Sequence, residues 1–68
     1  MIVFDPLWRT LKAKNISIYK LLTEYGLSHG TYDSLKHNRN VTANTISQLC
    51  KMLHCRVEDI CEYVADKE

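Results

Sequence analysis

The sequence predicts an all-α fold, a compact bundle of about five short helices that contains a helix-turn-helix. Apolar residues recur at helical spacing in several segments, as in Ile46, Leu49, Cys50 and Leu53. Hydroxyl residues stand directly before several of these segments, where helix N-caps belong. No segment alternates polar and apolar residues for long enough to predict a strand, and only residues 2–4 indicate a short extended piece.

The stretch from Ser17 to His37 predicts two short helices joined by a tight turn. Ser17 and Ser28 are the predicted N-caps, because a serine hydroxyl accepts from an orphan N–H of the first turn. Gly26 stands in the turn, where the chain needs a residue that adopts positive φ. The predicted inward residues are Ile18, Leu21, Leu22 and Tyr25 in the first helix, Leu27 in the turn, and Tyr32 and Leu35 in the second helix.

The other predicted helices flank this core. Asp5 is the expected N-cap of a first helix that ends at Asn15 and buries Leu7, Trp8 and Leu11. An exposed polar loop, residues 37–40, leads to Thr42, the expected N-cap of the fourth helix. A last short helix is expected to turn one apolar face inward, formed by Val57, Ile60, Cys61 and Val64.

The outward residues of the second helix of the pair are small or able to hydrogen-bond, as a helix in a DNA major groove requires. Gly30 costs this helix about 1 kcal/mol relative to Ala, and we favour close approach to DNA over simple tolerance of glycine at a helix start. Asp33 would repel phosphate, so it either accepts from a cytosine amino group or orients a basic side chain, and we favour the second. Lys36 and Arg39 are predicted phosphate contacts, with solvated charge as the alternative.

Charge is distributed unevenly along the chain. The net charge is only +1, but residues 1–40 hold six basic and three acidic residues, whereas residues 41–68 hold three basic and five acidic ones. The helix pair therefore lies in the positive half, which suits binding to phosphates. Ordinary mixed-charge solvation remains the alternative.

Length and motifs exclude several classes of protein. The 68 residues predict one domain, with no membrane span and no signal peptide, so we expect a cytoplasmic protein. No nucleophile–base constellation, phosphate-cradling glycine loop or carboxylate pair is present, so we expect no catalytic residues, no cofactor and no small-molecule ligand. A zinc site was weighed for Cys50, His54, Cys55 and Cys61, but no spacing matches a known finger, and we expect core cysteines and no metal.

From Leu7 to Val64 the order of features resembles the phage-repressor-like (Cro-like, XRE) helix-turn-helix domains, in particular their compact bacterial subgroup. The resemblance depends on the conjunction of many short stretches, which include Leu7-Trp8, Asn15-Ile16-Ser17, Gly26-Leu27-Ser28, Thr31-Tyr32, Asn38 to Val41, Thr45-Ile46, Leu49-Cys50 and Val57-Glu58-Asp59-Ile60. It implies a lambda-repressor-like fold and a sequence-specific transcriptional regulator, usually a homodimer on a palindromic site in double-stranded DNA.

Carried over by position, the resemblance places the recognition helix at Ser28 to His37. The residues it implies for base contacts are His29, Gly30, Thr31 and Ser34. For phosphate contacts, together with Lys36 and Arg39, it implies Ser17, Ser28, Asn38 and Asn40. The chain departs from the family at Ile18, where many members carry a DNA-contacting Gln, and at Leu22, where a small residue is usual.

Two functions follow from these observations. The first is a DNA-binding transcriptional regulator, expected to act as a repressor and to dimerise through the last helix, with Val57, Ile60, Tyr63 and Val64 as the candidate surface. The alternative is a protein-interaction module, such as an antitoxin or antirepressor subunit, that kept the fold but not strong DNA binding. The features that favour the alternative are Ile18, Leu22 and Asp33.

Overall fold

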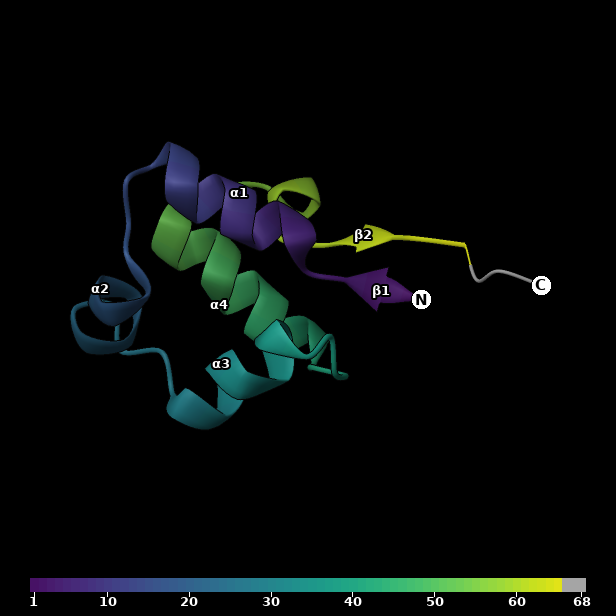
Figure 1. The fold of residues 1–68 in the computed structure, drawn as a ribbon, viewed down its shortest axis with the longest axis horizontal. Coiled ribbons are helices and arrows are strands. Elements are labelled where there is room, and N and C mark those ends of the chain that lie inside the picture. Colours follow the sequence, from purple (N-terminus) through teal and green to yellow (C-terminus); the bar gives the residue numbers. More distant parts are fainter. Residues whose placement is uncertain (66–68) are drawn as a thin grey trace.

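A computed structural model describes residues 1–65 of the chain. In this range four α-helices surround one apolar core, and the two ends of the described chain meet in a short sheet (Figure 1). The elements, in chain order, are β1 (Ile2–Val3), α1 (Asp5–Ala13), α2 (Ile18–Thr23), α3 (His29–Lys36), α4 (Ala43–Leu53), the 3-10 turn η1 (Val57–Asp59) and β2 (Glu62–Tyr63). No helix among these residues is long and apolar enough to cross a membrane.

Three predicted N-caps are confirmed. The Ser17 hydroxyl accepts from the Lys20 N–H at 3.0 Å at the start of α2. Ser28 does the same for Thr31 at 3.1 Å at the start of α3, and Thr42 accepts from the N–H of Thr45 at 3.2 Å at the start of α4. Each cap satisfies one of the backbone donors that a helix start leaves unpaired.

The start of α1 differs from the prediction. Asp5 is the first residue of the helix, and the N-cap position is Phe4, which has no side-chain cap. Phe4 is 2% exposed, so burial of its ring decides where the helix begins. The Asp5 carboxylate still lies in the first turn, where the helix dipole favours negative charge.

The core is built from one or two leucines or isoleucines of each helical element. Leu7, Leu21, Leu35, Leu49 and Ile60 are fully buried, and they come from α1, α2, α3, α4 and the residue after η1. Trp8 and Tyr32 meet edge to face, with ring centroids 6.0 Å apart. That contact joins α1 to α3 and confirms that both aromatics are packing residues.

The predicted last helix is wrong. A single 3-10 turn, η1, ends at Asp59, and the chain then extends to form β2. Ile60 is buried as expected, but Val57 is 55% exposed and Val64 is 43% exposed, so the expected inward face does not exist. A helix this short is marginal on its own, and β-branched and aromatic residues fit a strand once β1 offers a backbone partner. The predicted dimer surface on a C-terminal helix is therefore wrong as well.

We call β1, β2 and the adjoining Met1 and Val64 the β arm. Ile2 pairs with Tyr63 and Val3 with Glu62 in antiparallel register. The ladder extends by one pair, because the Val64 N–H donates to the Met1 carbonyl at 2.8 Å and the Met1 amino group donates to the Val64 carbonyl at 2.6 Å. The extended piece indicated at residues 2–4 is thus confirmed at Ile2–Val3.

Candidate nucleic-acid interface

The helix pair α2–α3 forms a helix-turn-helix. Gly26 adopts φ +75° after α2, in the left-handed region that favours glycine, and buried Leu27 lies in the turn. Leu35 is fully buried and Tyr32 packs on the core, so α3 is held by one side only. The predicted recognition helix, Ser28 to His37, is confirmed with Ser28 and His37 as its N-cap and C-cap.

A shallow groove of about 390 Å³ runs along the free side of α3. Gly30, Thr31 and Ser34 form one wall of this groove. The other wall comes from the loop before α4 and from the start of α4, and it consists of Asn40, Val41, Thr42 and Thr45. Three of the four predicted base-contacting residues therefore lie together, whereas His29 is exposed but does not line the groove.

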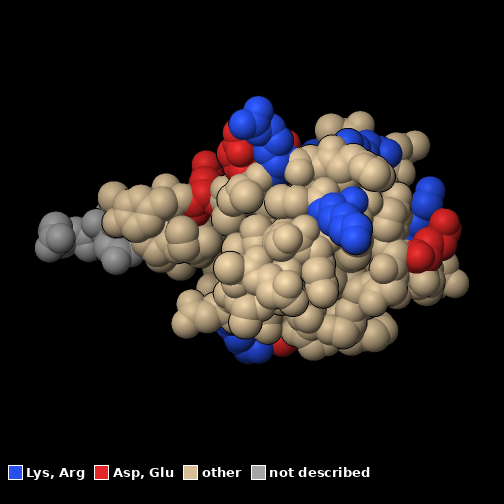
Figure 2. Space-filling view, turned by 180° about the vertical axis from the view of Figure 1, so that it is seen from behind, with Lys and Arg blue, Asp and Glu red and all other residues tan. Residues whose placement is uncertain are grey.

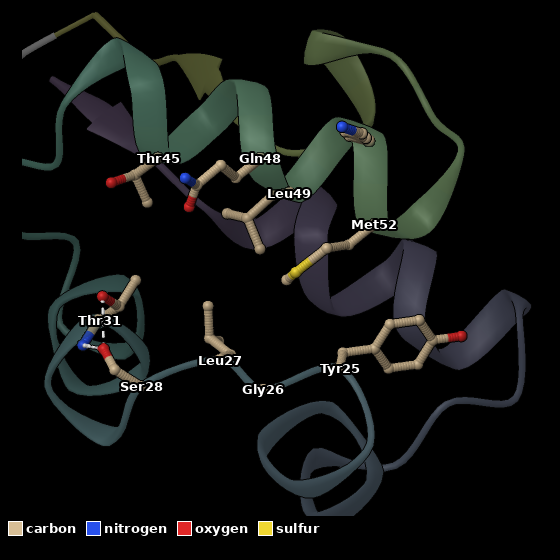
Figure 3. Close-up of a pocket in the computed structure, with 10 residues that line it drawn as sticks. Tyr25, Gly26, Leu27, Ser28, Thr31, Thr45, Gln48, Leu49 and Met52 are labelled. Carbon is tan, nitrogen blue, oxygen red and sulfur yellow. Dashed lines mark hydrogen bonds between the residues drawn. The ribbon is translucent and has the colours of Figure 1, made fainter.

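The hydroxyl groups at the start of α3 are linked to each other. Ser28 accepts from the backbone N–H of Thr31 and donates its own proton to the Thr31 Oγ1 at 2.8 Å (Figure 3). The Ser28 hydroxyl is thus used within the cap, and the Thr31 hydroxyl keeps its proton for an outside acceptor. A phosphate contact from Ser28 would have to use its backbone N–H rather than its side chain.

Asp33 gathers two basic groups at the end of α3. Its Oδ2 accepts from the Arg39 Nη1 at 2.8 Å, and its Oδ1 lies 3.3 Å from the Nδ1 of His37. The carboxylate therefore orients a neighbouring basic side chain, as predicted. Arg39 uses one of its five N–H donors here and remains 61% exposed, so the other donors are available to a phosphate.

The remaining predicted phosphate contacts differ in how free their side chains are. Lys36 is exposed and makes no ion pair within residues 1–65, and Asn40 is exposed beside the groove. Asn38 is half-buried with φ +55°, and its Oδ1 accepts from the Phe4 N–H at 2.9 Å. Only the side-chain NH₂ of Asn38 remains for an outside acceptor, because its backbone N–H donates to Leu35.

Gly30 is not required by the fold. Its φ is not in the left-handed region, and a Cβ atom at this position would meet nothing within 4 Å. The space beside Gly30 opens into the groove. Close approach of a ligand backbone therefore stays the reason we favour for this residue.

Three groove residues were not among the predicted contacts. Val41, Thr42 and Thr45 complete the second wall. The Thr42 cap was itself predicted, and a capped helix start directly after a polar loop is the signal that points to anion binding at this place. What the sequence did not reveal is that α4 begins beside α3, since this depends on the crossing of the two helices.

A second hollow lies on the other side of Thr31, between the turn and α4. It is lined by residues of the turn, including Tyr25, Gly26 and Leu27, and by Gln48, Leu49 and Met52 of α4 (Figure 3). Buried Leu27 and Leu49 form its floor, and no cluster of charged side chains converges on it among the described residues. It therefore offers no catalytic or metal chemistry.

The cysteines are half-buried free thiols. Burial raises the pKa of Cys55, with smaller contributions from Cys50 and Asp59, and burial also raises the pKa of Cys61. Both thiols are therefore protonated at neutral pH, which makes them poor nucleophiles and poor metal ligands. No group of three or more His, Cys, Asp or Glu residues is placed to hold a metal ion within residues 1–65.

The capped helix pair and its open polar groove define a helix-turn-helix DNA-binding domain. The chain belongs to the family of Cro/C1-type HTH DNA-binding domains, whose model matches residues 6–66. It is similar to the crystal structure of the transcriptional regulator VanUg, with a TM-score of 0.85 and 26% sequence identity, covering 96% of this chain and 87% of that chain. No curated protein matches this sequence.

Proposed function

We propose that this protein is a sequence-specific transcriptional regulator that inserts α3 into the major groove of its operator. In this proposal Gly30, Thr31 and Ser34 approach the base edges, with His29 beside them. Lys36, Arg39 and Asn40 contact phosphates on one side, and Ser17 and Ser28 contact them through the helix starts. Occupying an operator is enough to block transcription, so we propose repression, in the cytoplasm where the DNA lies.

The groove along α3 carries this proposal. Its walls hold glycine, hydroxyl and amide groups, which hydrogen-bond to DNA without adding bulk, and no acidic residue lines it. The one carboxylate on the exposed side of α3, Asp33, is compensated by Arg39 at 2.8 Å. A basic side chain therefore stands at the end of the helix where a negative one would otherwise repel phosphate.

We further propose that the protein binds as a homodimer on a palindromic site. The net charge is +1, and few basic side chains lie near the groove, so one subunit would make few phosphate contacts and bind weakly. Two subunits on two half-sites combine their affinities on one duplex.

The alternative, a protein-interaction module, loses its support from particular residues. Ile18 and Leu22 are half-buried and pack against the apolar core, so both departures from the family are explained by packing. Asp33 is explained by its contact with Arg39. No specific observation is left that favours the alternative over DNA binding.

Fluorescence anisotropy with two labelled duplexes, one from the protein's own promoter and one of random sequence, tests the proposal. We expect tighter binding to the promoter, and binding to both duplexes that weakens steeply between a low and a high salt concentration. Absence of binding at low salt, or equal binding to both duplexes, would contradict a sequence-specific regulator.

A pair of arginine variants sharpens this test. Arg39→Ala should weaken binding to both duplexes about tenfold and reduce the slope of log affinity against log salt by about 1, because one phosphate contact is lost. Arg56→Ala is the matched control, since Arg56 is 82% exposed and precedes η1, on the opposite side of the molecule from α3 (Figure 1). Equal effects of the two variants would contradict a specific role for the α3 side.

A further inference from the structure

The β arm exposes apolar side chains on both of its strands. Met1 is 53% exposed, Ile2 46%, Tyr63 69% and Val64 43%. The outer described part of the arm carries no charged side chain at its surface (Figure 2). Such a cluster costs free energy in water and marks a surface that another molecule covers.

The pairing within the arm determines which backbone groups point outward. Met1 and Val64 exchange both of their backbone hydrogen bonds. Pairs alternate along an antiparallel ladder, so the next pair, Ile2 with Tyr63, is not hydrogen-bonded. The N–H and C=O groups of Ile2 and Tyr63 therefore point away from each other, toward the two outer edges of the sheet.

The two outer edges differ. The edge of β1 faces the loop between α3 and α4, where Asn38 accepts the Phe4 N–H, and side chains from residues 38–41 lie beside it. The edge of β2 has no neighbouring element in the described chain (Figure 1). It also lacks the devices that block edge pairing, since β2 contains no proline and no lysine.

We propose that β2 pairs with β2 of a second copy of this chain, antiparallel about a two-fold axis at Tyr63. Tyr63 and the partner's Tyr63 would exchange two backbone hydrogen bonds through their outward N–H and C=O groups. Their rings would form an aromatic cross-strand pair on one face of a four-stranded sheet. The inference rests on the homodimer of the proposed function and names the surface through which it forms.

A second copy fits this edge better than an unrelated strand does. An antiparallel edge is complementary to itself, because each residue offers both a donor and an acceptor. With Tyr63 opposite the partner's Tyr63, Glu62 stands opposite the partner's Val64, so the two glutamates do not face each other. Glu62 is also compensated within its own subunit by Arg9, at 3.9 Å.

Two proline variants test the proposal by sedimentation velocity of the whole chain without DNA. Tyr63→Pro removes only the outward N–H and leaves the ladder within the arm intact, so it should weaken dimerisation about tenfold or more. Ile2→Pro removes the outward N–H of the other edge and is the matched control, which should dimerise as the unmodified chain does. Circular dichroism establishes that both variants keep the fold.

A charge pair tests the two-fold axis itself and does not depend on proline. Tyr63→Lys and Tyr63→Glu should each weaken the dimer, because like charges meet across the axis, whereas an equimolar mixture should form a heterodimer. Tyr19→Lys, at a tyrosine that is 77% exposed on α2, should leave the dimer unchanged.

Three results would overturn the proposal. They are a monomer at concentrations up to about 1 mM, where even a millimolar dimer is largely formed, a dimer insensitive to Tyr63→Pro, and equal losses from Tyr63→Pro and Ile2→Pro. A dimer that behaves as expected but binds no duplex would contradict the proposed function and leave the β2 interface standing.

Discussion

The α3 side of the molecule and the β arm present opposite chemistry. Around α3 the exposed residues are small, polar or charged, and the groove beside them holds no acidic group. The arm exposes four apolar side chains and the open edge of β2. Polar groups at a helix suit phosphates and base edges, whereas apolar groups at a strand edge suit another protein chain. The difference indicates that one small domain carries two separate binding surfaces.

The two regions also differ in how they are attached to the core. Leu35 anchors α3 and is fully buried, while the outer residues of the arm, such as Val64, bury little. Leu35→Ala should lower the free energy of unfolding by about 2–5 kcal/mol, because it removes core contacts and leaves a cavity. Val64→Ala should change it by less than about 0.5 kcal/mol. Urea denaturation of both variants measures the difference, and similar losses would mean that the arm is part of the core.

The cap of α3 should show a smaller effect. Ser28→Ala removes the acceptor for the Thr31 N–H and should cost about 1 kcal/mol. Ser47→Ala is the matched control, because Ser47 is exposed within α4, where alanine is the better helix former. Thermal unfolding of both variants gives the comparison. A stability loss at Ser47 equal to that at Ser28 would contradict the capping role.

Gly30 separates stability from binding on α3. Gly30→Ala should stabilise the free protein by about 0.5–1 kcal/mol, since a Cβ has room and alanine favours a helix. The same methyl group should weaken duplex binding if the backbone approaches DNA closely. Urea denaturation and anisotropy on one sample measure both changes. A variant that is more stable and binds equally well would assign Gly30 to simple tolerance at a helix start.

The smallest expected effect concerns the thiols on the arm side. Burial raises the pKa of Cys61, which precedes β2, and of Cys55. A group whose pKa is raised by folding stabilises the protein fully below its unfolded pKa and loses this contribution as pH rises through the folded value. Stability should therefore begin to fall above about pH 8.5. Cys61→Ala should flatten this alkaline decline in urea denaturation, and an unchanged slope would show that another group causes it.

The helix-turn-helix was predictable because its signals are local. Ser17, Ser28 and Thr42 each cap a helix within three residues of chain, and Gly26 provides the left-handed turn. The contact between Asp33 and Arg39 was also predictable, since both residues belong to one short segment.

The end of the chain was not predictable in the same way. The apolar spacing from Val57 to Val64 fits a helix, but the described chain forms β2, because its partner β1 lies about sixty residues away in sequence. Local periodicity carries no information on such a pairing. The second wall of the groove was missed for the same reason, as it depends on how α3 and α4 cross.

Amide chemical-shift mapping of the labelled protein, titrated with its promoter duplex, tests DNA binding by α3 most directly. We expect the largest changes between Ser28 and Thr45, concentrated at Gly30, Thr31, Ser34 and Arg39, because these residues line or flank the groove. The amides of Ile2 and Tyr63 should change little beyond what dimerisation alone produces. Changes centred on α1 or on the arm, with the α3 amides unmoved, would contradict DNA recognition by this helix.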